Sequence, residues 1–176
     1  MTRSFGYFTE GIPYKVLDER TIRASAGIML LLGAIAFVNG FVLNKFDIIP
    51  YISGFLALNF SIGIFINPLY APTYWLASQI VKGQTPLPIG AIQKKFAWSL
   101  GVLMSGAIFG LSLFLLKDPT FFKPVCFLCV WCMAFLYFES AFGICVGCML
   151  YHQFLDWKIL KRPKVKPNCM GDSCDL

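Results

Sequence analysis

Long apolar runs separated by short polar segments dominate the chain. Three runs are long enough to form membrane-spanning helices, because a hydrocarbon core of about 30 Å needs about 20 helical residues. These runs are Ala24–Leu43, Ile49–Leu69 and Phe96–Leu116. A fourth run extends from Val125 to Tyr151 and is interrupted by one charged residue, Glu139. The pattern predicts an all-α, polytopic membrane protein with four transmembrane helices.

The segments that flank the apolar runs define the domain organisation. Residues 1–23 are polar and lack the apolar core of a cleavable signal peptide, which predicts an N-terminal arm. The four runs place the membrane domain at residues 24–152 and leave a polar tail at 153–176. Tyr70 to about Val81 mixes aromatic and apolar side chains, and this mixture favours a short helix in the headgroup zone.

The distribution of charge predicts the orientation of the chain. Charged residues make up 14% of the sequence against 57% hydrophobic residues, and the formal net charge is +6. With four spans, Lys45, Lys117 and Lys123 fall on one side, while the other basic residues flank the cytoplasmic ends of the helices. Both termini are therefore expected in the cytoplasm. This pattern explains the basic excess without a nucleic-acid partner and leaves the lipid bilayer as the expected environment.

Four stretches resemble a family of small bacterial integral-membrane proteins of unknown function. They are Asp18-Glu19-Arg20-Thr21-Ile22-Arg23, Ile66-Asn67-Pro68-Leu69-Tyr70, Lys95-Phe96-Ala97, and the most specific one, Phe138-Glu139-Ser140-Ala141-Phe142-Gly143-Ile144-Cys145-Val146-Gly147-Cys148-Met149-Leu150-Tyr151. The resemblance implies a bacterial inner (plasma) membrane location. It also implies that Glu139, Cys145, Gly147 and Cys148 belong to a site shared by the family.

All seven cysteines lie in the last third of the chain, in three closely spaced groups. The groups are Cys126, Cys129 and Cys132; Cys145 and Cys148; and Cys169 and Cys174. Such spacing lets two thiols share a disulfide, a metal ion or a sulfur atom. Pro124 is expected at the first position of the fourth helix, which would place Cys126 in its first turn, where the helix dipole favours a thiolate.

Cys145 and Cys148 share one helical face with His152, seven residues after Cys145. Two thiolates and an imidazole suit Zn²⁺ or Cu(I), and Cys169 and Cys174 would extend the set to a four-cysteine spacing. His152 is equally well explained as a polar residue at the membrane boundary. No cofactor is required by the sequence.

The path of the fourth run decides how the thiol groups relate to one another. In one straight helix, Cys132 and Cys145 lie about 20 Å apart, near opposite membrane faces. A break at Gly143 is left open, and it would place Cys145 at a new helix N-terminus. Glu139 is expected near mid-depth, facing the bundle, either protonated or paired with Asn39, Asn59 or another polar group.

These observations favour a thiol-based relay that moves reducing equivalents or a sulfur species between the membrane faces. A thiol–disulfide oxidoreductase with a thioredoxin-like or sulfur-carrier partner is one form of it, and a non-enzymatic transporter, with a homodimer left open, is another. The alternatives are a soft-metal binding or transport protein and a structural accessory subunit. In the relay, the roles are Cys126 and Cys129 as outer acceptor, Glu139 as proton-coupling group, Cys145 and Cys148 as inner pair, and Cys169 and Cys174 as mobile cytoplasmic partner.

Overall fold

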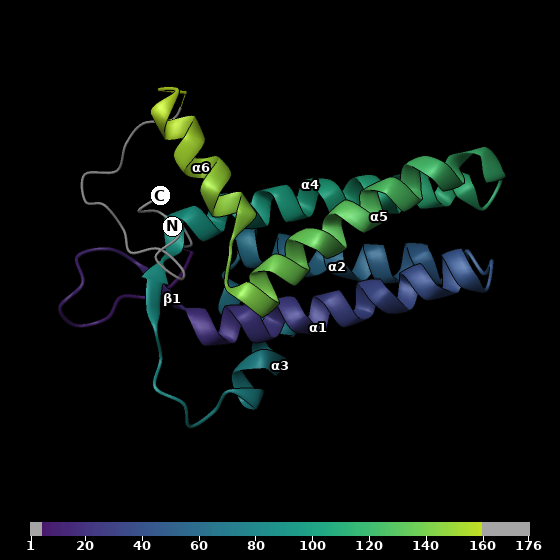
Figure 1. Cartoon of the computed structure of the whole chain (residues 1–176). Helices are drawn as coiled ribbons and strands as arrows, with labels where there is room; N and C mark the ends of the chain where they lie inside the picture. Colours follow the sequence, from purple (N-terminus) through teal and green to yellow (C-terminus); the bar gives the residue numbers. More distant parts are fainter. Residues whose placement is uncertain (1–4, 160–176) are drawn as a thin grey trace.

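The computed structural model describes residues 5–159, and in this part of the chain four helical segments are long and apolar enough to cross a membrane (Figure 1). The segments are Glu19–Val42, Ile48–Phe65, Ala91–Leu115 and Pro119–Phe142. The predicted fold class and the first three predicted spans are therefore confirmed, with boundaries shifted by a few residues. The fourth span ends earlier than predicted.

The long helices run side by side and form the bundle in Figure 1. Their bounds are α1 (Glu19–Phe37), α2 (Ile48–Phe65), α4 (Ala91–Leu115) and α5 (Phe122–Tyr137). A π-helical turn, η1 (Val38–Val42), extends α1, while η3 (Pro119–Phe121) precedes α5 and η4 (Phe138–Phe142) follows it. A glycine lets α2 and α4 pack closely, because a Cβ on Gly63 of α2 would lie only 1.9 Å from the ring of Trp98 of α4.

Short elements gather at the end of the bundle where α1 and α4 begin (Figure 1). We call this the sheet end. The elements are β1 (Val16–Asp18), β2 (Pro88–Gly90), η2 (Pro68–Tyr70), α3 (Pro72–Ile80) and α6 (Val146–Asp156). Helix α3 forms where the sequence predicts the short helix between the second and third spans.

The two short strands form an antiparallel sheet that the sequence does not predict. Val16 pairs with Gly90 and Asp18 pairs with Pro88. Each strand has only three residues, too few to show a period-2 pattern. The sheet ties the N-terminal arm to the segment before α4.

Asp18 fixes the start of α1 five residues before the predicted span. Its carboxylate accepts a hydrogen bond from the backbone N–H of Thr21 at 3.1 Å, as an N-cap residue does. It also accepts one from the backbone N–H of Leu87 at 2.9 Å. The same side chain therefore caps the helix and holds the loop that leads into β2.

Buried polar side chains join α3 to the bundle. Asn59 is 1% exposed and accepts hydrogen bonds from the backbone N–H and the hydroxyl of Thr73 at 3.0 and 3.1 Å. The hydroxyls of Thr73 and Ser25 lie 2.8 Å apart, which adds α1 to the network. A buried polar group is tolerated only when it is hydrogen-bonded, so this network specifies the position of α3.

The fourth apolar run is not one helix from Val125 to Tyr151. Gly143 ends η4 in the left-handed conformation (φ +70°), and α6 begins three residues later at Val146. Glycine adopts this conformation at no steric cost. The break left open by the sequence is therefore present.

The start of α5 also differs from the sequence prediction. The helix begins at Phe122, after a turn that Asp118 caps by accepting from the N–H of Thr120 at 2.9 Å. Pro124 is therefore the third residue of α5 rather than the first, and Cys126 is the fifth. Cys126 lies beyond the first helical turn, where the favourable effect of the dipole on a thiolate declines.

Candidate thiol site

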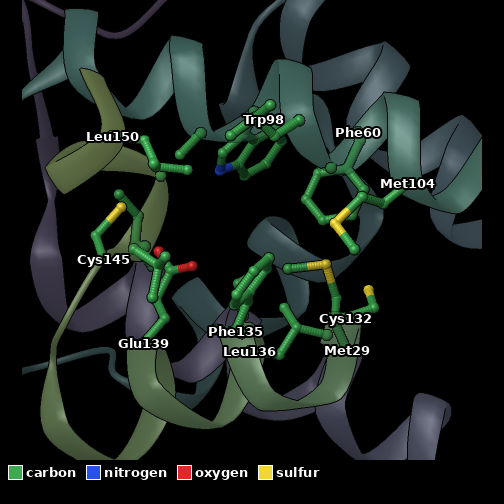
Figure 2. Close-up of a pocket in the computed structure, with 18 residues that line it drawn as sticks. Met29, Phe60, Trp98, Met104, Cys132, Phe135, Leu136, Glu139, Cys145 and Leu150 are labelled. Carbon is green, nitrogen blue, oxygen red and sulfur yellow. The ribbon is translucent and has the colours of Figure 1, made fainter. Parts of the chain in front are cut away.

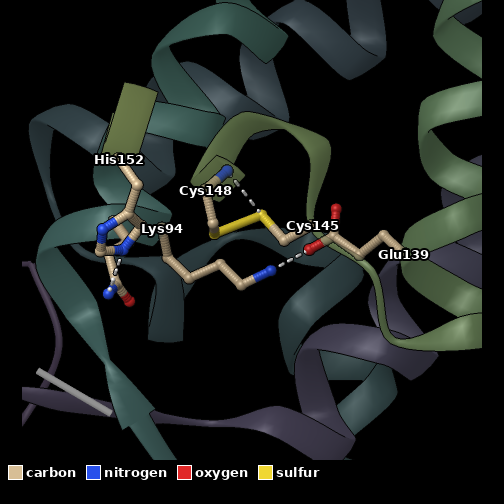
Figure 3. Close-up of a disulfide and its surroundings, with 6 residues drawn as sticks. Lys94, Glu139, Cys145, Cys148 and His152 are labelled. Carbon is tan, nitrogen blue, oxygen red and sulfur yellow. Dashed lines mark hydrogen bonds and ion pairs between the residues drawn. A yellow bond between two sulfur atoms is a disulfide. The ribbon is translucent and has the colours of Figure 1, made fainter. Parts of the chain in front are cut away.

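Cys145 and Cys148 form a disulfide at the start of α6 (Figure 3). Cys145 is the N-cap residue, with an extended backbone (φ −93°, ψ 95°), and its Sγ accepts a hydrogen bond from the backbone N–H of Cys148 at 3.2 Å. The two residues are 1% and 3% exposed. The break at Gly143 therefore places a buried disulfide at a helix N-terminus.

This position determines the electrostatics of the pair. The first N–H groups of a helix have no intrahelical acceptor, and together with the helix dipole they favour negative charge. When the disulfide is reduced, the sulfur at the N-cap is the one that these groups stabilise as a thiolate. A continuous helix would have placed the same two thiols near a C-terminal end, where the dipole has the opposite effect.

Lys94 and Glu139 lie beside the pair and form a largely buried ion pair (Figure 3). The side chain of Lys94 is 1% exposed and that of Glu139 is 17% exposed. Lys94 comes from the first turns of α4, and Glu139 comes from η4, just before the break. The polar partner of Glu139 is therefore a lysine, while Asn59 bonds to Thr73 and Asn39 donates to the backbone of Ile35.

Lys94 is the residue of this candidate site that sequence reasoning missed. The Lys94-Lys95 dipeptide has the pattern of a pair of interfacial anchors, and Lys95 is indeed exposed. A signal was present, because Lys94 lies four and seven residues before Trp98 and Gly101, which face the bundle interior. Helical spacing therefore assigns Lys94 to the buried face and Lys95 to the outside.

The predicted depth of Glu139 is also wrong. The candidate span Pro119–Phe142 ends three residues after Glu139. The carboxylate consequently lies near the sheet end of the bundle, rather than at mid-depth. The error follows from treating the apolar residues of α6 as part of the same span.

Gly147 allows α6 to approach α4 closely. A Cβ at Gly147 would lie 2.6 Å from the Cβ and 2.8 Å from the Cα of Ala97. Contacts below 3.0 Å with backbone atoms require one helix to move. Gly147 therefore sets the distance between the disulfide and α4, the helix that carries Lys94.

His152 lies on α6, one turn after Cys148. Its Nε2 is 3.0 Å from Nε2 of Gln93, a residue that is 2% exposed. Within residues 5–159, no three His, Cys, Asp or Glu side chains are grouped to hold a metal ion. Cys169 and Cys174 lie outside the described residues, so the predicted metal set of Cys145, Cys148, His152, Cys169 and Cys174 stays a prediction.

A cavity opens beside the disulfide, inside the bundle (Figure 2). Its volume, counted as the space that the centre of a water molecule can occupy, is about 70 Å³. Its lining is mostly apolar and aromatic, and it includes Cys145, Glu139 and Cys132. Cys132 and Cys145 line the same cavity because the chain turns back at Gly143, so the separation expected for one straight helix does not apply.

A second, smaller cavity of about 30 Å³ adjoins the first along α5. The two cavities share Cys132 and Leu136 as lining residues, and the second is also lined by Cys129 and Met133. The thiols of Cys126, Cys129 and Cys132 are free and half-buried. Of the two predicted acceptor residues, Cys129 lines the second cavity and Cys126 lines neither, while Cys132 lines both cavities.

Comparison with known proteins identifies the family of the chain. The family model described as "Domain of unknown function (DUF4395)" matches residues 17–155, and the chain belongs to this family. The matched region includes both described cysteine groups, Lys94 and Glu139. Neither the curated proteins nor the solved structures contain a match to the chain.

Proposed function

We propose that this protein is a membrane thiol–disulfide oxidoreductase whose Cys145 and Cys148 alternate between a dithiol and a disulfide. The observation that carries the proposal is the disulfide at the N-terminus of α6, with Cys145 lining a cavity inside the bundle. Redox-active cysteine pairs share this setting, in which a helix N-terminus stabilises one thiolate.

The two cysteines have different roles in this proposal. Cys145 is the nucleophile, because its Sγ accepts the N–H of Cys148 and the residue is part of the cavity wall. Cys148 is the resolving residue, whose sulfur closes the disulfide onto Cys145. Reduction consumes two electrons and two protons, supplied through a mixed disulfide by a dithiol partner such as a thioredoxin-like or sulfur-carrier protein.

Lys94 and Glu139 supply the charge balance and the proton path. When Cys145 is a thiolate, it adds a negative charge close to the carboxylate of Glu139, and the ammonium of Lys94 offsets this charge. Glu139 lines the same cavity as Cys145, so its carboxylate is positioned to accept and return a proton there. Glu139 thus keeps the proton-coupling role that its place in the sequence suggests.

We place the sheet end on the cytoplasmic side of a bacterial inner membrane, with both termini cytoplasmic. The distribution of basic residues supports this orientation. Cys129 and Cys132 then continue from the cavity toward the opposite face, and the acceptor role of Cys126 and Cys129 belongs to that outer half. A dimer is compatible with this arrangement and is not required by it.

A redox titration tests the proposal. The purified protein is equilibrated in dithiothreitol buffers of defined potential, its free thiols are alkylated, and Cys145–Cys148 is quantified by mass spectrometry. We expect a reversible two-electron transition that Cys145→Ser and Cys148→Ser each abolish, whereas Cys126→Ser preserves it. A pair that stays oxidised or stays reduced at every potential would contradict the proposal.

Soft-metal binding is the second candidate, and one observation favours it. Sulfur atoms line both cavities, from Met29, Met104, Cys132 and Cys145 in the first and Cys129, Cys132 and Met133 in the second. Thiolate and thioether ligands select Cu(I) over hard cations. The test is titration of reduced protein with Cu(I): this candidate requires stoichiometric binding that is lost in Cys132→Ser. The third alternative, an accessory subunit, requires that serine at all of Cys145, Cys148, Cys169 and Cys174 leave function unchanged.

A further inference from the structure

We propose that the cavity beside Cys145 binds the ring of a membrane quinone, which the reduced Cys145–Cys148 pair converts to the quinol. This inference rests on the proposed function and names the electron acceptor of the same site. The cavity, its aromatic lining and the groups on its wall carry it.

The location of the cavity selects a lipid-soluble substrate. Its lining residues come from α1, α2, α4, α5 and η4, within candidate membrane spans, and from the start of α6. Among these residues Glu139 is the charged one, and the rest are almost entirely apolar. A polar oxidant would lose its hydration without new partners there, whereas an apolar ring gains by burial.

The size and shape of the lining suit one planar ring. A single water needs about 10–15 Å³ of such space, so about 70 Å³ accommodates a group of several heavy atoms. Phe60, Trp98 and Phe135 supply aromatic surfaces around it (Figure 2). Met29 and Met104, whose side chains are flexible, complete this wall and adjust to ring substituents.

The reacting groups lie on one side of the cavity. Figure 2 shows Cys145 and Glu139 on neighbouring parts of the wall, with Trp98 across the open space. A ring held between them lies against the residue that carries the nucleophilic sulfur and the residue that carries the carboxyl group. Lys94, paired to Glu139, adds positive charge where a quinone oxygen becomes negative during reduction.

The proposed step balances in electrons and protons. Cys145 loses its thiol proton to Glu139, and its thiolate forms a C–S bond to a ring carbon of the quinone. Cys148 loses its proton as its sulfur attacks Cys145 Sγ, so the S–S bond forms, the C–S bond breaks and its electron pair passes into the ring. The two quinone oxygens take up the two protons, one from Glu139 and one from Cys148. The dithiol is oxidised to a disulfide, and the quinone is reduced to a quinol.

The test uses the full chain with serine at Cys126, Cys129, Cys132, Cys169 and Cys174, so that the one remaining pair is Cys145 and Cys148. The protein is reduced, freed of reductant without oxygen and mixed with ubiquinone-1 or, separately, menaquinone-1. We expect one quinol for each disulfide formed. The absorbance of the quinone gives the amount of quinol, and alkylation of the thiols gives the amount of disulfide. Comparison of the two quinones shows whether the cavity accepts a single benzoquinone ring, the fused naphthoquinone ring system or both.

Two adjacent residues of α4 provide a matched pair of variants. Met104 lines the cavity, and Leu103 is 68% exposed and points away from the bundle. Met104→Trp fills the cavity and should slow quinol formation at least tenfold, whereas Leu103→Trp adds the same bulk outside and should leave the rate within twofold. Both should retain the dithiothreitol redox transition.

The outcomes separate this inference from the proposed function. No quinol from a pair that still cycles with dithiothreitol, or equal rates in Met104→Trp and Leu103→Trp, overturns the quinone site and leaves the oxidoreductase standing. A pair that does not cycle with dithiothreitol overturns both. If Met104→Trp also loses the dithiothreitol transition, that variant has a fold defect. Ala26→Leu, which fills the same cavity from α1, then replaces Met104→Trp as the test.

Discussion

The cysteine groups of α5 and α6 have the same spacing and different structures. Cys129 and Cys132 are three residues apart within regular α5, as Cys145 and Cys148 are at the start of α6, yet only the second pair forms a disulfide. Within a regular helix, the Cβ atoms of residues three apart are about 5–6 Å from each other, whereas a disulfide requires about 3.5–4.5 Å. The extended backbone of Cys145 removes this mismatch. Backbone context, rather than spacing, distinguishes the pairs.

The largest expected effect is a direct test of this contrast. Under mild oxidation with diamide, Cys145 and Cys148 should be fully joined, whereas a disulfide between Cys129 and Cys132 should appear in fewer than about a tenth of the molecules, because a regular helix must distort to form it. Peptide mapping after alkylation measures both. Equal oxidation of the two pairs would show that the helix break does not control disulfide formation.

Removing the charge that faces the disulfide is expected to have the next largest effect. Lys94→Met leaves Glu139 without its partner in a mostly buried site, which should lower the free energy of unfolding by about 3–5 kcal/mol. Unfolding in detergent by denaturant measures it. Lys95→Met, at the exposed neighbouring position, is the control and should change little.

The double variant Lys94→Met with Glu139→Gln sharpens this result. It removes both charges, so most of the lost free energy of unfolding should return. The redox potential of the Cys145–Cys148 pair should nevertheless differ from that of the parent protein. If Lys94→Met is as stable as the parent protein, the ion pair has no structural role.

Gly147 tests how the disulfide is positioned against α4. Gly147→Ala places a methyl group against the backbone of Ala97 and should destabilise the protein by about 1–3 kcal/mol. Gly110→Ala is the matched control, because a Cβ there meets nothing within 4 Å. Thermal unfolding in detergent compares the two, and similar melting temperatures would argue against the close helix contact.

Gly143 tests the break itself and has the smallest expected effect. Gly143→Ala keeps the left-handed turn at a cost of about 1–2 kcal/mol. The disulfide should still form. Under mild reduction, however, its cysteines should become accessible to alkylation sooner than those of the parent protein. Unchanged stability and unchanged reduction would show that the turn does not require glycine.

The sequence predicts the elements that depend on long patterns. Twenty-residue apolar runs identify the four spans, and the Cys145–Cys148 spacing identifies the thiol pair, because both signals are local. The position of the break is local too, since Gly143 marks it, but glycine is common in membrane helices and does not by itself end one. Its consequence for Cys145 and Cys132 therefore emerges only from the fold.

The site contacts that sequence reasoning misses join residues far apart along the chain. Lys94 and Glu139 are 45 residues apart, and Gln93 and His152 are 59 apart. A lysine at the start of a membrane helix is usually an exposed anchor, so burial of Lys94 follows from the helices that pack around it. The role of Gly147 likewise depends on Ala97, a residue of another helix.

Arg23 has a consequence for the order in which the protein assembles. Its guanidinium donates hydrogen bonds to the carbonyls of Ser140 and Ala141, at 3.3 and 2.9 Å, and these carbonyls belong to the turn that interrupts the fourth apolar run. Backbone carbonyls left without partners within a bilayer cost several kcal/mol. Arg23 lies at the start of α1, so its guanidinium is synthesised before residues 138–142. The nascent chain thus carries a binding site for the later turn, and the thiol pair acquires its geometry only when that late segment docks onto α1.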